Sequence, residues 1–152
     1  MRVVCQRVSE ASVRVDGDVV GAIGQGILIL LGVGPADDDL IAAAMAKKIA
    51  GLRIFSDDQD RMNFSVTDIG GSCLVVSQFT LYGDCKKGRR PFFGGAADPE
   101  LAERLCSVFV GCLREHVAKV EVGQFGADMD VALRNDGPVT LILDSSELGL
   151  GT

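Results

Sequence analysis

The amino-acid sequence predicts a single α+β domain. Its 152 residues suit one compact unit, and a composition of 47% hydrophobic and 24% charged residues is that of an ordinary globular domain. Short strand patterns, several of them joined by hairpin signals, occupy both ends of the chain, while only two segments show helical spacing. No repeat or linker interrupts these patterns, so we expect one layered core rather than two domains.

The first part of the chain is predicted to form strands. Residues 3–8 are rich in valine and lead into residues 11–15, where apolar and polar side chains alternate. Asp16-Gly17 then marks a two-residue hairpin turn, because glycine accepts positive φ. After a glycine-rich turn, the continuous apolar run 27–33 is typical of a central buried strand.

Two segments show the spacing of amphipathic helices. The acidic run 37–39 offers a cap and favourable charge for the first helix. Asp98-Pro99 is a good cap and first-turn pair for the second. The apolar positions are Ile41, Met45, Ile49 and Leu52 in the first helix, and Leu101, Leu105, Val108, Phe109 and Cys112 in the second. We expect each helix to bury this one face against the sheet.

The remaining segments are predicted as short strands and loops. Further strands are expected at 53–55 and 72–81, and two or three more over the segments 119–122, 128–134 and 139–144. The turn after the strand at 53–55 lacks the glycine and the closing glutamate of a calcium loop. The glycine-rich, basic segment that follows the strand at 72–81 is predicted as a loop. We therefore assign residues 1–144 to the domain and 145–152 to a flexible C-terminal tail.

The charge balance limits how the protein could bind nucleic acid. With 15 basic and 21 acidic residues, the net charge is −6 and the pI is near 4.7. This acidity argues against a protein that holds DNA or RNA by neutralising many phosphates. It remains compatible with recognition of one nucleic-acid end at a local site.

The chain start and the cysteines predict a cytoplasmic protein that does not contact membranes. Arg2, Gln6 and Arg7 interrupt the N-terminal apolar residues, so no signal-peptide segment forms. The longest aliphatic run, residues 27–31, is too short to span a bilayer. The five cysteines are odd in number and include no C-x-x-C pair, which fits neither a disulfide framework nor a zinc site. Cys85, in the polar loop, is the one candidate for a reactive thiol.

Common catalytic motifs are missing from the sequence. It has no phosphate-binding loop of the G-x-x-x-x-G-K-[ST] type and no G-x-S-x-G nucleophile elbow. His116 is the only histidine, and it falls at the end of the second predicted helix. A Ser-His-Asp or Cys-His enzyme is therefore not expected, and we predict no metal and no cofactor.

Two polar interruptions of apolar segments are more informative. In the predicted strand 72–81, alternation places Gln78 and Thr80 on one face, about 6.6 Å apart. They could bind an ester or amide carbonyl, or simply form cross-strand hydrogen bonds. Residues 135–138, Asn-Asp-Gly-Pro, have the composition of a turn, and a Gly-Pro bond adopts the cis form at small cost. That turn could serve a site or merely join two strands.

The same two segments carry a resemblance to a known family. Ser-Gln-Phe-Thr-Leu at 77–81 and Asn-Asp-Gly-Pro-Val-Thr at 135–140 resemble the paired signature motifs of the D-aminoacyl-tRNA deacylases. The resemblance extends over nearly the whole chain. Further matching segments, in order, are 6–8, 11–13, 31–33, 52–56, 62–63 and 125–129.

The resemblance implies a homodimeric hydrolase of tRNA esters. Such an enzyme cuts the ester between a D-amino acid, or glycine, and the 3′-terminal adenosine of tRNA, and it rejects L-aminoacyl-tRNA. The implied fold is a barrel-like core of antiparallel and mixed sheets with two helices. The implied catalytic residues are Ser77, Gln78, Phe79 and Thr80. The implied chiral selector is a cis Gly137-Pro138 that enters the partner subunit's pocket, and Arg7 supports that motif. Phe125 and Met129 are implied to border the adenosine site.

The implied chemistry follows from main-chain groups. Main-chain carbonyls at Gly137-Pro138 would bind the substrate amino group and leave no space for an L side chain. Because glycine has no side chain, such a site could not reject it. Thr80 could be a nucleophile only if a neighbouring group accepted its proton. We favour amides near Phe79 and Thr80 that stabilise the oxyanion, with the ribose 2′-hydroxyl assisting water.

Alternatives remain for the basic loop and for the activity. Lys86, Lys87, Arg89 and Arg90 could contact acceptor-stem phosphates or form a solvated loop. A non-catalytic dimer that binds an aminoacyl or nucleotide group would keep the fold but be free to lose the motifs. A related deacylase with a trans Gly-Pro bond would tolerate a small L side chain.

Overall fold

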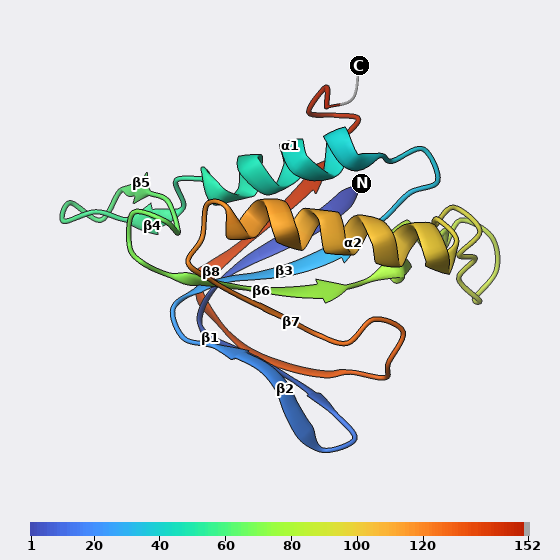
Figure 1. Ribbon diagram of the computed structural model, residues 1–152, viewed down its shortest axis with the longest axis horizontal. Helices are drawn as coiled ribbons and strands as arrows, with labels where there is room; N and C mark the ends of the chain where they lie inside the picture. The colour runs from blue at the N-terminus through green and yellow to red at the C-terminus, as the bar shows by residue number, and fades with distance from the viewer. Residues whose placement is uncertain (151–152) are drawn as a thin grey trace.

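A six-stranded sheet and two helices on one side of it make up the fold (Figure 1). The computed structural model describes residues 1–150. The strands of the sheet are β1 (Arg2–Val15), β2 (Asp18–Ile23), β3 (Gly26–Gly32), β6 (Ser72–Ser77), β7 (Lys119–Val122) and β8 (Asp130–Asp144). The helices are α1 (Asp39–Ala50) and α2 (Pro99–Arg114), and a short hairpin pairs β4 (Phe55–Ser56) with β5 (Met62–Phe64).

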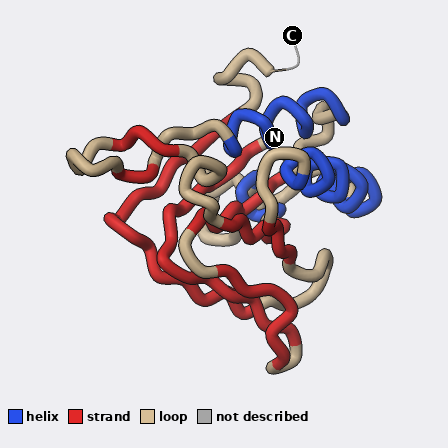
Figure 2. The backbone as a smooth tube through the Cα atoms, turned by 60° about the vertical axis from the view of Figure 1, so that its left-hand side comes forward, coloured by secondary structure: helices blue, strands red, loops and turns tan. Residues whose placement is uncertain are grey.

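The long strand β1 organises the sheet. It pairs antiparallel with β3, β2 and β8, while β3, β6 and β7 are parallel neighbours. The sheet curls until β2 also contacts β6 and β7 (Figure 2). Gly21 permits this approach, because a Cβ atom there would lie 2.8 Å from the main-chain oxygen of Val122. The expected barrel-like core of mixed sheets is confirmed.

Side-chain alternation along the strands separates two apolar clusters. In β3, Ile27, Ile29 and Leu31 face the helices, whereas Leu28 lies in the cluster enclosed by the curled sheet. Strand β6 follows the same rule, with Val75 toward the helices and its neighbours toward the enclosed cluster. The apolar run 27–33 is therefore a central strand buried on both faces, as predicted.

Both helices begin where the sequence predicts. The Asp38 and Asp98 carboxylates each accept a hydrogen bond at 2.9 Å from the amide three residues ahead. Asp37 does not cap; its carboxylate binds the Met1 amino group instead. Helix α1 ends at Ala50, earlier than expected. The buried residues of α2 are Leu105, Phe109, Val110 and Leu113, with Leu101, Val108 and Cys112 partly buried.

Three predicted segments differ from the structure. The strand at 72–81 ends at Ser77, and a 3₁₀ helix, η1 (Phe79–Tyr82), replaces its second half. The segment 135–138 is no turn between two strands; it lies inside the continuous strand β8. The strand predicted at 53–55 is shifted to β4, and β5 was not predicted.

The predicted flexible tail includes a segment that contacts the chain start. The Ser145 hydroxyl accepts from the Met1 amino group at 2.7 Å, and the Leu150 amide donates to the Ser145 carbonyl at 2.9 Å. Residues 151–152 of the predicted tail lie outside the described part of the chain. Between residues 1 and 150, neither helix has the length and apolarity that crossing a bilayer requires.

Candidate active site

A cavity of about 350 Å³ lies beyond the carboxyl end of β6. Ser77, Gln78 and Phe79 of the first motif line it. Phe93, from the loop before α2, and Phe125, from the segment after β7, complete an apolar wall. The edge of the Phe79 ring meets the Phe93 ring at 5.2 Å between centroids and an interplanar angle of 74°. One cavity thus joins the first motif to Phe125.

The chain turns at Gln78, and this turn decides how the first motif is presented. The Gln78 amide still donates to the Leu31 carbonyl at 2.8 Å, which extends the β3 pairing by one residue. The backbone then enters η1, so Gln78 and Thr80 are not two residues of one strand face. They are nevertheless adjacent, because the Gln78 side-chain amide donates to the Thr80 hydroxyl. The strand geometry predicted for these two residues is wrong, and the turn into η1 brings them together instead.

The first turn of η1 leaves amide donors available. The first N–H groups of a helix have no acceptor within it. In the described structure, no main-chain carbonyl accepts from the amides of Phe79 and Thr80. These two N–H groups come from consecutive residues beside the cavity. They can therefore donate together to a single oxygen atom.

Within the described part of the chain, the side chains that line the cavity include no carboxylate, imidazole or amine that could act as a base, and no thiolate. Cys106 lines the cavity, but burial, and after it the charge of Glu103, raises the pKa of its thiol to about 11. The thiol is therefore protonated and a poor nucleophile at neutral pH. His116 follows the far end of α2, a helix about 24 Å long whose first turns border the cavity. The Thr80 hydroxyl thus contacts an amide rather than a proton acceptor.

The second motif forms a bulge in β8. Gln6 pairs with Thr140 and Val8 with Asn135, so residues 136–139 lie opposite the single residue between them. The Asn135 side chain closes the bulge, because its oxygen accepts from the Val139 amide at 2.7 Å and its nitrogen donates to the Val139 carbonyl at 3.2 Å. Within the bulge, the Gly137-Pro138 bond is cis, as the family resemblance implies.

Arg7 is the residue opposite the bulge. Its Nε donates to the Asp136 carbonyl at 2.8 Å, and its Nη1 donates to the Ile54 carbonyl at 2.6 Å. The Asp136 carboxylate lies 3.6 Å from the same Nε. Arg7 is only 9% exposed, so these bonds are made in a largely water-free environment. One guanidinium therefore links the Gly-Pro segment to the chain entering β4.

Within one chain the two motifs lie at opposite ends of β3. Arg7, opposite the Gly-Pro bulge, pairs with Ile27 at the start of that strand. The Gln78 amide donates to the Leu31 carbonyl near the end of that strand. Four residues of a strand span about 13 Å. The structure therefore does not bring Gly137-Pro138 to the cavity of its own chain.

The other predicted residues have different surroundings. Phe125 lines the cavity, whereas Met129 packs against the apolar cluster enclosed by the sheet. Lys86, Lys87, Arg89 and Arg90 are all exposed, in a loop closed by the Asp84–Phe92 bridge. Within residues 1–150, no three His, Cys, Asp or Glu side chains lie close enough together to hold a metal ion.

Sequence reasoning missed part of the cavity wall. Phe93, Ala97, Ala102 and Cys106 line the cavity from the loop and first turns of α2. Their only signal was the Asp98-Pro99 cap, which fixes the start of α2 but not its position against β6. That position follows from the Ala97 amide, which donates to the Val33 carbonyl at 2.9 Å.

Comparison with known proteins gives consistent similarities. A model of the D-Tyr-tRNA(Tyr) deacylase family matches residues 4–144. The D-aminoacyl-tRNA deacylase of Desulfatibacillum aliphaticivorans is 59% identical over 145 residues, covering 95% of this chain and 99% of that protein. The enzyme of the same name from Thermomicrobium roseum is 58% identical over 152 residues, covering 100% and 99%.

Two solved structures share the fold. A protein titled c-Myc DNA unwinding element binding protein is 41% identical, with a TM-score of 0.90 over 95% of this chain and 99% of that one. A probable eukaryotic D-amino acid tRNA deacylase is 17% identical, with a TM-score of 0.78 over 93% and 97%. The family match and the full-length relatives show that the chain belongs to the D-Tyr-tRNA(Tyr) deacylase family.

Proposed function

We propose that this chain, an ester hydrolase by its family membership, removes D-amino acids from the 3′-terminal adenosine of tRNA. The observation that carries the proposal is the cavity where Ser77, Gln78 and Phe79 meet the Phe125 ring. A cavity of about 350 Å³ with aromatic walls suits one nucleoside and its ester. This reading requires only a local contact with the end of the RNA, which a net charge of −6 permits.

In the mechanism we propose, the protein stabilises charge and the substrate assists attack. The amides of Phe79 and Thr80 donate to the carbonyl oxygen as it becomes an oxyanion. Water attacks the carbonyl carbon, the ester C–O bond breaks, and the ribose oxygen leaves with a proton. The neighbouring 2′-hydroxyl of the ribose assists this attack. Gln78 orients the Thr80 hydroxyl at the site.

We propose that Gly137-Pro138 selects against L-aminoacyl-tRNA by steric exclusion. Arg7 and Asn135 hold the motif on both sides, which gives it the fixed position that rejection of one enantiomer requires. Its main-chain carbonyls bind the substrate amino group. Glycine carries no side chain to exclude, so Gly-tRNA is also a substrate.

The site we propose is completed by a second copy of the chain. The separation of the two motifs along β3 supports this, since the Gly-Pro segment of one copy would enter the cavity of the other. Strand β8 also exposes Ile142 to 80% and Leu133 to 36%. Exposed apolar side chains on an edge strand are typical of an interface. The proposed assembly is a homodimer.

The basic loop and the compartment follow from the same proposal. Lys86, Lys87, Arg89 and Arg90 are exposed near Phe93 of the cavity wall and would contact phosphates of the acceptor stem. Charge reversal at these four positions is expected to weaken tRNA binding and flatten its salt dependence. The proposed compartment is the cytoplasm, where charged tRNA is used.

The function is tested with three substrates. The purified protein is incubated with D-Tyr-tRNA, Gly-tRNA and L-Tyr-tRNA, without added metal, and loss of each ester is followed. We expect loss of the first two only. Equal loss of all three would refute chiral selection, and no loss of any would indicate a binding module without activity.

A further inference from the structure

We propose that a groove along α2 binds the nucleotide that precedes the terminal adenosine of the tRNA. This inference rests on the proposed function. The groove, called here the α2 groove, has a volume of about 260 Å³ and is lined by Glu103, Ser107 and Arg114 of α2 and by the segment after β7. It shares Ser77, Cys106 and Phe125 with the candidate active-site cavity. The two spaces are therefore neighbours with a common wall.

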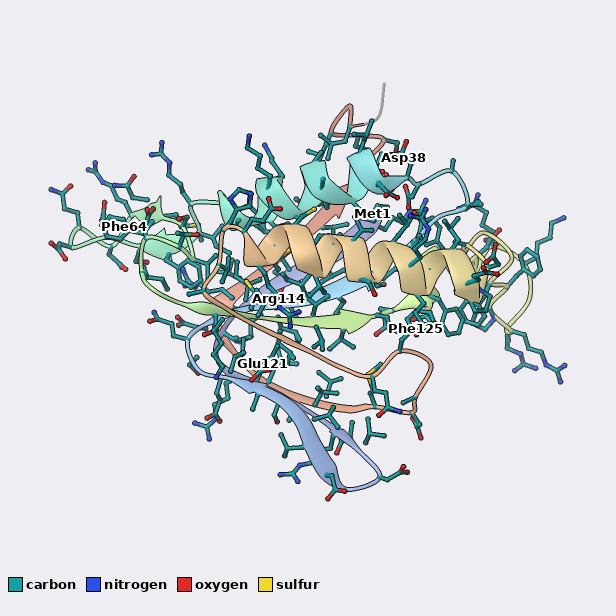
Figure 3. The ribbon with its side chains drawn as sticks, in the orientation of Figure 1. Met1, Asp38, Phe64, Arg114, Glu121 and Phe125 are labelled. Carbon is teal, nitrogen blue, oxygen red and sulfur yellow. The ribbon has the colours of Figure 1, made fainter. Side chains whose placement is uncertain are left out.

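The groove follows one face of α2. Glu103, Ser107 and Arg114 recur at four and seven residues, the spacing of side chains on one side of a helix. Eleven residues of helix span about 16 Å. Arg114 lies beneath α2, while Phe125 lies toward the other end of the helix (Figure 3). The groove therefore extends from the wall of the cavity toward the end of α2 that carries the arginine.

The two charged residues of the groove are available for a ligand. Arg114 donates from Nη2 to the Val120 carbonyl at 3.0 Å, which fixes the guanidinium and leaves its other donors unused. Neither Arg114 nor Glu103 forms an ion pair within the described residues. A fixed guanidinium with free N–H groups suits a phosphate. A free carboxylate suits the amino group of a base.

A nucleotide matches this arrangement better than an amino-acid side chain. The adenosine in the cavity must continue through its 5′ oxygen into a phosphate and a preceding nucleotide, which is cytidine because tRNA ends in C-C-A. The Phe125 ring at the common wall offers a surface for stacking. Glu103 can accept from the cytosine amino group, and Arg114 can bind the phosphate. The α2 groove thus has a group for each part of the cytidine.

The test compares esters of different length. D-Tyr esters of adenosine, CpA and UpA are hydrolysed by the wild-type protein and by Arg114→Gln and Glu103→Gln. We expect kcat/KM for the CpA ester to exceed that for the adenosine ester by about tenfold. Arg114→Gln is expected to bring this ratio close to one. Glu103→Gln replaces the charged acceptor with a neutral, weaker one and is expected to reduce the preference for CpA over UpA. The ratio cancels any general loss of folding.

Arg104→Gln is the matched control. Arg104 is on the same helix, contacts Asp39 and does not line the groove, so the variant should keep the wild-type ratio. Equal kcat/KM for the adenosine and CpA esters, or an unchanged ratio in Arg114→Gln, would overturn the inference. Arg114→Gln could instead change the preference between the D-Tyr and D-Ala esters of adenosine and leave the ratio of the CpA ester to the adenosine ester unchanged. That result would overturn the inference and show that the groove binds the amino-acid side chain.

A binding measurement keeps the inference independent of activity. If no ester reacts, the proposed function fails, and fluorescence of 5′-labelled CpCpA then decides about the groove. Weaker binding of CpCpA to Arg114→Gln than to Arg104→Gln would support the groove as a nucleotide site. Equal binding to both variants would refute it.

Discussion

The guanidinium of Arg7 donates to the main-chain oxygen of Asp136 at 2.8 Å, directly before the Gly-Pro motif. A second donor of the same group bonds to the Ile54 carbonyl at 2.6 Å. The two acceptors are therefore held by one rigid, planar side chain from the opposite strand. A planar group with several fixed donors can set the position of both segments at once, which a flexible ammonium cannot do.

Arg7→Lys is therefore expected to reduce chiral discrimination more than it reduces the rate with D-Tyr-tRNA. The lysine ammonium keeps the charge but cannot maintain both hydrogen bonds, so the Gly-Pro segment becomes less fixed. We expect the ratio of D-Tyr-tRNA to L-Tyr-tRNA hydrolysis to fall about tenfold, the equivalent of ~1.4 kcal/mol. Arg14→Lys, on the exposed end of β1, is the control. An unchanged ratio in Arg7→Lys would show that Arg7 does not position the selector.

Phe79→Pro tests the proposed oxyanion donors. Proline lacks the amide hydrogen, and the first position of a helix tolerates it. Loss of one such donor is expected to lower kcat by about 100-fold or more. Phe79→Ala keeps the amide and removes only the ring, so it separates the donor from the aromatic wall. If both variants lost the same activity, the amide would have no part in the reaction.

Much of the fold could be predicted from the sequence, because its signals are local. The Asp16-Gly17 hairpin, the two capped helices and the apolar strand 27–33 depend on neighbouring residues alone. The end of β6 could not be predicted in this way. Residues 73–76 are a continuous apolar run and residues 78–81 alternate polar and apolar side chains, so the pattern reads as strand to its end, whereas the break at Gln78 arises where the chain meets the end of β3.

The site was predictable as two motifs but not as an arrangement. Asn135 and Gly137 have the composition of a turn, so local reasoning separates β8 into two strands. The structure keeps one strand because the Asn135 side chain forms the two hydrogen bonds with the Val139 main chain that a neighbouring strand would otherwise form. The α2 wall of the cavity involves contacts between distant segments, for which a single sequence carries no local signal.

Thr80→Ala tests whether the threonine is a nucleophile. Its hydroxyl contacts the Gln78 amide and no base, so its removal should disturb orientation rather than remove a covalent step. We expect kcat to fall about tenfold, a loss typical of one hydrogen bond, and Thr80→Ser to retain most of the activity. Complete loss of turnover with binding intact, together with an acyl ester trapped on Thr80, would contradict the proposed mechanism.

The buried thiols predict a decline in stability at high pH. Burial raises the pKa of Cys73 to about 12, and burial followed by the Glu103 charge raises the pKa of Cys106 to about 11, each from 9.0. At a pH above 9.0 and below the raised pKa values, these thiols lose their protons in the unfolded chain but keep them in the folded chain. The free energy of unfolding therefore falls as pH rises above about 9. Urea denaturation from pH 8 to 11 measures this decline. Cys106→Ala should make it shallower; an identical slope would contradict the assignment.

Complementation between two inactive variants tests most directly whether the active site is shared between two chains. Phe79→Pro removes a donor from the cavity. Gly137→Val fills the selector, where φ is +141° and a Cβ atom would lie 2.8 Å from the Val139 side chain. Circular dichroism and sedimentation first establish that both variants fold and dimerise.

The two variants are then mixed, unfolded together and refolded. If each site combines the cavity of one chain with the Gly-Pro segment of the other, half of the dimers are mixed and each mixed dimer has one intact site. We therefore expect D-Tyr-tRNA hydrolysis to return to about one quarter of the wild-type rate. A mixture that stays as inactive as the separate variants would contradict a site shared between two chains.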